Sequence, residues 1–114
     1  MKKRIWMSYD LGLNGDYPSL YAWLDEHDAK EAGDSVATFE YEFNGNNDDD
    51  LLSSLRNELI EKVPNVSNAR VYIIRSKNVN HGNFSFTGSF IYGRRKGSPW
   101  EGYGNTGENE DDAE

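Results

Sequence analysis

Apolar and polar residues alternate along four stretches of the chain, and a period of two is typical of β-strands. These stretches are residues 4–10, 35–43, 69–75 and 84–92. In the first of them, Ile5, Met7 and Tyr9 fall on one side, and the stretch ends at Asp10. Turn-forming residues at 78–83 separate the last two stretches, so we predict that these two strands form a hairpin.

Two further stretches show the spacing of helices. Residues 17–32 follow a good N-cap residue, Asp16, and precede Gly33, which can adopt the backbone conformation that ends a helix. Residues 49–63 repeat leucine and isoleucine at helical intervals and stop before Pro64, which cannot continue a helix.

The predicted order is therefore β-α-β-α-β-β. This order predicts an α+β two-layer sandwich, with a four-stranded sheet and both helices on one face. A ferredoxin-like arrangement is the alternative if residues 35–43 bend into two short strands. Within 84–92, Gly88 interrupts a row of aromatic residues and marks either a bulge or a close approach of another group.

Charge is unevenly distributed along the 114 residues, whose formal net charge is −8. Residues 105–114 contain five acidic and no basic residues, whereas the remainder has 15 acidic and 12 basic residues. We predict one globular domain over residues 1–104 followed by a disordered acidic tail over 105–114. The globular part lacks the net positive charge that general nucleic-acid binding requires, so nucleic acid is not an expected partner.

The chain has no cysteine, which excludes disulfides, thiolate metal sites and a cysteine nucleophile. No apolar run approaches the roughly 20 residues of a membrane span. The basic start is followed by too short an apolar stretch, ending at Asp10, for a signal peptide. We therefore predict a cytoplasmic protein that does not enter membranes.

Three carboxylates suggest one possible metal site. Asp10 ends the first predicted strand, and Glu40 and Glu42 lie late in the second. If the two strands are neighbours, the three side chains meet at one rim and hold Mg²⁺ through oxygen ligands. In the other interpretation, Asp10 caps a turn and the glutamates face solvent. The two histidines, His27 and His81, form no zinc pattern, and His27 falls on the apolar side of the first helix.

Basic and aromatic residues cluster after the last strand. They are Arg94, Arg95, Lys96, Trp100 and Tyr103. Such a cluster can bind the phosphates and stack on the bases of a nucleic acid. It can also form a protein interface, since interfaces are rich in Arg, Trp and Tyr. In a third interpretation, this segment is an ordered arm that packs back on its own domain. We favour the interface, formed by Arg94, Arg95, Trp100 and Tyr103.

The order of segments resembles a known family. The resemblance rests on three segments of this sequence: Tyr9-Asp10 at the end of the first strand, GDSVATFEYEF at residues 33–43 and ARVYII at residues 69–74. Over residues 4–75 the chain resembles the small CRISPR-associated adaptation nucleases and their VapD-type toxin relatives. The resemblance implies a ferredoxin-like fold, a dimer, and, in some members, metal-dependent cutting of RNA or DNA by an aspartate at the position of Asp10.

The leading hypothesis is a small cytoplasmic protein-interaction or assembly module, a homodimer or a binder of another protein, with no cofactor and no enzymatic activity. One alternative is a nuclease that uses Asp10 with Mg²⁺. The other is an acidic inhibitor that imitates nucleic acid.

Overall fold

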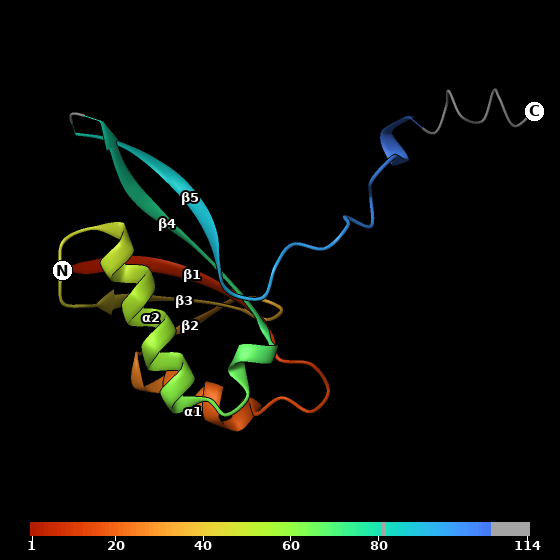
Figure 1. Cartoon of the computed structure of the whole chain (residues 1–114), viewed down its shortest axis with the longest axis horizontal. Helices are drawn as coiled ribbons and strands as arrows, with labels where there is room; N and C mark the ends of the chain where they lie inside the picture. Colours follow the sequence, from red (N-terminus) through yellow and green to blue (C-terminus); the bar gives the residue numbers. More distant parts are fainter. Residues whose placement is uncertain (81, 106–114) are drawn as a thin grey trace, which may run out of the picture.

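The computed structural model describes residues 1–80 and 82–105. Its strands are β1 (Lys2–Asp10), β2 (Lys30–Gly33), β3 (Val36–Glu42), β4 (Arg70–Asn80) and β5 (Asn83–Tyr92). Its helices are α1 (Tyr17–Glu26) and α2 (Asp48–Lys62), with short 3₁₀ turns η1 (Val66–Asn68) and η2 (Tyr103–Asn105). The strands form one antiparallel sheet in the order β2-β3-β1-β4-β5 (Figure 1).

The predicted four-stranded sheet with the order β-α-β-α-β-β is wrong, because the sheet has five strands. The additional strand is β2, which comes from the end of the predicted helix 17–32. The ferredoxin-like alternative is also wrong as stated. It required residues 35–43 to bend into two strands, but β3 is a single strand there, and the sheet continues past β4 to β5.

The first helix ends early because the chain turns back into a hairpin. His27 is the C-cap, and Asp28 takes a left-handed conformation with φ of 57°. After β2, Ser35 is again left-handed with φ of 58°, and Gly33 pairs with Val36 across the tight turn. Pairing with β3 thus outweighs the helical tendency of the Lys30-Glu31-Ala32 segment, since propensity is a weak term beside tertiary pairing.

Both helices cover the same face of the sheet (Figure 1). From α1 and α2, Leu20, Trp23, Leu51, Leu55 and Leu59 are buried. They pack against sheet residues that alternate along the strands, including Ile5, Met7, Phe39, Tyr41, Val71 and Ile73. Both helices place one apolar side inward, as their spacing predicts.

One ion pair lies within this covered face. Arg75 of β4, which is 1% exposed, donates from Nε to Asp48 Oδ1 at 2.9 Å and from Nη2 to Asp48 Oδ2. Arg75 Nη1 donates to Ser89 Oγ at 2.9 Å. The hydrogen bonds from Arg75 hold the pKa of Asp48 below its usual value. Asp48 therefore joins the start of α2 to the hairpin of β4 and β5.

A second polar cluster joins α1 and α2 to β3 through Glu58. Its carboxylate accepts from Trp23 Nε1 at 2.8 Å and from the Tyr41 hydroxyl at 2.9 Å. His27 Nε2 lies 3.1 Å from the same carboxylate, and its ring packs against Trp23 at a tilt of 41°, with centroids 4.2 Å apart. His27 thus has the boundary position that its place on the apolar side predicts. Burial raises the pKa of Tyr41 to about 12.

Other predictions concern residues outside this description. His81 and most of the predicted tail, from residue 106 to 114, lie outside the described residues. In the part of the chain that is described, neither α1 nor α2 has the length and apolar character needed to cross a bilayer.

Candidate binding site on the open face of the sheet

Within residues 1–80 and 82–105, neither α1 nor α2 covers the second face of the sheet (Figure 1), and we call this face the open face. Strand register places the following residues there: Arg4, Trp6, Ser8 and Asp10 of β1; Thr38 and Glu40 of β3; Arg70, Tyr72 and Ile74 of β4; and Phe86, Gly88 and Phe90 of β5. A sheet with one packed and one solvated face ordinarily shows polar residues on the solvated side. Here several of the largest residues on that side are apolar.

The aromatic part of the open face lies over β1, β4 and β5. Phe86 is 71% exposed and contacts Trp6 edge to face, with ring centroids 6.5 Å apart. Ile74 beside them is 41% exposed. Tyr72 and Phe90 form a second edge-to-face pair at 4.8 Å. A contiguous exposed apolar patch of this kind is typical of a binding surface.

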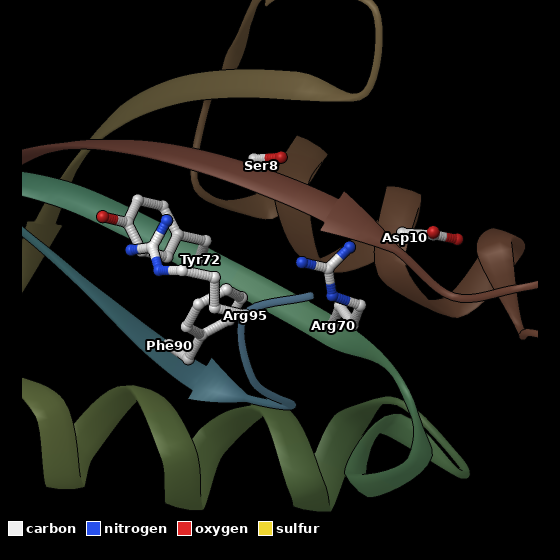
Figure 2. A pocket seen from close by; sticks show the side chains of 6 residues that line it. All are labelled: Ser8, Asp10, Arg70, Tyr72, Phe90 and Arg95. Carbon is white, nitrogen blue, oxygen red and sulfur yellow. The ribbon is translucent and has the colours of Figure 1, made fainter. Parts of the chain in front are cut away.

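A hollow of about 270 Å³ lies at one end of the open face. Ser8 and Asp10 of β1, Arg70 and Tyr72 of β4, Phe90 of β5 and Arg95 of the segment that follows line this hollow, which we call the Arg70 pocket (Figure 2). Three neighbouring strands and the first residues of segment 93–105, which we call the arm, therefore contribute to one site.

Two arginines converge on one ring in the Arg70 pocket. The guanidinium carbons of Arg70 and Arg95 lie 5.5 Å and 5.9 Å from the centroid of Phe90. Arg70 Nε donates to the backbone oxygen of Arg94 at 3.2 Å, which fixes the start of the arm against β4. No described carboxylate forms an ion pair with Arg70 or Arg95. The pocket therefore concentrates positive charge beside aromatic surface.

Asp10 is in register with Arg70 but does not pair with it. Its Oδ1 instead accepts a hydrogen bond from the backbone N–H of Gly12 at 3.0 Å. Figure 2 shows the carboxylate of Asp10 directed away from the Arg70 guanidinium. Gly12 has φ of 77°, so this contact closes a turn after β1. The geometry favours the interpretation of Asp10 as a turn cap.

The Tyr72 side chain occupies the space that Gly88 leaves free because glycine has no side chain. A Cβ atom at Gly88 would collide with the hydroxyl and ring of Tyr72, which lies across β5. Of the two predicted alternatives at Gly88, a bulge or a close approach, the structure has the close approach. The irregularities in pairing lie elsewhere, between Val71 and Tyr72 and between Asn78 and Asn80.

The structure does not bring together the three carboxylates of the possible metal site. Glu40 and Glu42 pair in register with Arg4 and Lys2, whereas Asp10 lies at the other end of β1. Six residues of strand, or roughly 20 Å, separate the levels of Glu40 and Asp10. Among the described residues, no three His, Cys, Asp or Glu side chains are grouped closely enough to hold a metal ion.

The predicted interface residues divide into two groups. Arg95 lines the Arg70 pocket, and Arg94 binds Arg70 through its backbone. Trp100 and Tyr103 lie farther along the arm and are 72% and 75% exposed. The backbone of the arm leads away from the sheet in Figure 1, whereas one interpretation of the sequence required the arm to pack back on its own domain.

Comparison of the chain with family models, curated proteins and solved structures found no match. Nothing in these comparisons bears on the resemblance to the CRISPR-associated and VapD-type proteins. The site therefore has to be interpreted from its own geometry.

Sequence reasoning missed four residues of the Arg70 pocket. They are Ser8, Arg70, Tyr72 and Phe90. The alternation in β1, β4 and β5 shows which of these share a face, but the sequence does not show that β4 lies between β1 and β5. Only the order of the strands in the sheet shows that these four residues line the same pocket.

Proposed function

We propose that the protein is an assembly module that pairs with a second copy of itself along the outer edge of β5. One observation carries this proposal. β5 is a ten-residue strand at the edge of the sheet, and it contains neither a charged residue nor a proline. An edge strand of this kind presents backbone groups that can pair with another strand.

The opposite edge has the protection that β5 lacks. β2 has only four residues, includes Lys30 and Glu31, and departs from regular register between Glu31 and Gly33. Short length, charge and irregular pairing are the usual means by which edge strands avoid association. The sheet is therefore protected at one edge and accessible at the other.

The end of β5 is hydrogen-bonded to the rest of the domain, whereas its beginning projects away from the domain. Near its end, the backbone oxygen of Ile91 accepts from Arg56 Nε at 3.3 Å, and the Tyr92 hydroxyl donates to the oxygen of Arg56 at 2.6 Å. The end of the hairpin at which β4 connects to β5 extends beyond the other strands in Figure 1, and the first half of β5 lies in this part. Phe84 and Phe86 on this half are 67% and 71% exposed.

A second copy suits this edge better than a different chain. Two β5 strands related by a twofold axis run antiparallel, and each supplies the groups that the other needs. Such pairing joins the two open faces into one surface, with phenylalanines on both sides of the junction. The arm follows directly after β5, so the exposed Trp100 is available to the same partner.

Substituting Phe84→Lys tests the proposal. The change removes an exposed apolar side chain and places a charge on the edge strand, which is one of the usual means by which edge strands avoid pairing. We expect the dimer dissociation constant to rise about tenfold or more, which corresponds to roughly 1.4 kcal/mol. Sedimentation equilibrium over a range of protein concentrations measures this constant.

The matched control is Ile60→Lys on α2, which adds the same charge at an apolar residue that is 56% exposed. We expect its dimer to resemble wild type. A wild-type protein that stays monomeric at all concentrations overturns the proposal. An equal loss of dimer in both variants removes β5 as the interface.

A further inference from the structure

We propose that the Arg70 pocket binds a phosphate group, carried by a small organic molecule or free in solution. This site is separate from the edge of β5, since its lining side chains stand on the open face and not along the strand edge. The inference does not rest on self-association.

The first argument is the unused donor capacity of the two arginines. Arg70 spends its Nε on a backbone oxygen, so its two terminal amino groups have no partner in the described part of the chain. Arg95 also has no ion-pair partner there. A guanidinium presents parallel N–H groups that match two oxygens of a phosphate.

The second argument is a contrast with another arginine of the same strand. Arg75 meets a carboxylate with two nitrogens and is buried. Arg70, five residues earlier on β4, has Asp10 directly across the strand pair, but that carboxylate is bound to the Gly12 N–H. The turn after β1 thus engages the Asp10 carboxylate, which forms no ion pair with Arg70 although both residues line the pocket.

The third argument is the chemistry of the remaining lining. Ser8 and Tyr72 each bring a hydroxyl group, which can donate to a phosphate oxygen. Tyr72 and Phe90 bring aromatic surface next to the cations. The hollow of about 270 Å³ is open on one side, so an organic group attached to the phosphate can lie against these rings.

Isothermal titration calorimetry on the full chain at low ionic strength tests the site, with inorganic phosphate and a nucleoside monophosphate as separate probes. The unphosphorylated nucleoside is the control for stacking alone. Tighter binding of the monophosphate than of phosphate identifies an organic phosphate as the ligand. Equal binding of both identifies the phosphate group alone. Both results support the site.

Two substitutions in the pocket shift the affinity in opposite directions. Arg70→Gln removes a charged donor and weakens binding by about tenfold or more. Asp10→Asn removes a negative charge from the pocket lining and strengthens binding by about twofold to threefold. A residue that only maintained the fold would not produce this opposition of signs.

Arg4→Gln is the matched control, because Arg4 is an exposed arginine of the same face that lies outside the Arg70 pocket. We expect it to change the affinity by less than twofold. If neither inorganic phosphate nor the nucleoside monophosphate binds, the proposal is overturned. Equal weakening in Arg4→Gln and Arg70→Gln also overturns it, because this result means diffuse attraction to the face.

Discussion

The two faces of the sheet differ in whether their charged side chains form ion pairs and hydrogen bonds with one another. On the covered face, Arg75 and Asp48 satisfy each other within the core, and Glu58 accepts from Trp23 and Tyr41. On the open face, Arg70 and Asp10 are neighbours in register but form no ion pair with each other. Satisfied polar groups stabilise a fold, whereas available ones can bind a ligand, so the comparison separates residues of structure from candidate residues of function.

The largest expected effect comes from breaking the covered pair. Arg75→Met leaves the Asp48 carboxylate without its partner in a largely buried position, and such a loss costs about 3–5 kcal/mol of unfolding free energy. Urea denaturation followed by circular dichroism measures this quantity. Arg70→Met on the open face is the matched control and is expected to change it by less than about 1 kcal/mol. Similar losses in both variants would contradict the contrast between the faces.

The next effect concerns the arm, whose aromatic residues belong to neither layer of the fold. Because Trp100 is exposed and Trp is common at binding hot spots, we expect Trp100→Ala to weaken self-association by about 2 kcal/mol or more. Light scattering at several concentrations gives the mass in solution. The unfolding free energy of the monomer, measured at low protein concentration, should stay unchanged. A dimer of unaltered strength would place the arm outside the interface.

The smallest effect should follow Asp10→Asn in the free protein. Asparagine retains the oxygen that accepts from the Gly12 N–H, so we expect the unfolding free energy to change by less than about 0.5 kcal/mol. Added Mg²⁺ should shift the melting temperature equally in the variant and in wild type. Specific stabilisation of wild type by Mg²⁺ would instead restore the metal-site hypothesis for Asp10.

Local patterns in the sequence predicted several elements closely. The predicted helix 49–63 corresponds to α2, with Asn47 as its N-cap and Val63 as its C-cap. The predicted hairpin is the pair β4 and β5, and Gly88 has the close approach that its position indicated. These features depend on neighbours in sequence, for which periodicity and turn residues carry the information.

Features that depend on pairing between segments were not predictable in the same way. Strand β2 forms because residues 30–33 find a pairing partner in β3, against their helical tendency. Arg75 and Asp48 are 27 positions apart, and no local pattern pairs them. The Arg70 pocket requires the order of β1, β4 and β5. Pairing with another segment, near in sequence for β2 and distant for the other two, decides all three features, and propensity does not encode it.

Strand β5 contributes to both proposals, because Phe90 lines the Arg70 pocket and the edge of the same strand would meet a second copy. A shared strand makes the two equilibria candidates for thermodynamic linkage. Linkage is reciprocal: whatever factor dimerisation imposes on phosphate affinity, phosphate imposes on dimerisation. The affinity for phosphate at low and at high protein concentration would then report the coupling energy, and a ratio of one would show that β5 keeps its face and its edge independent.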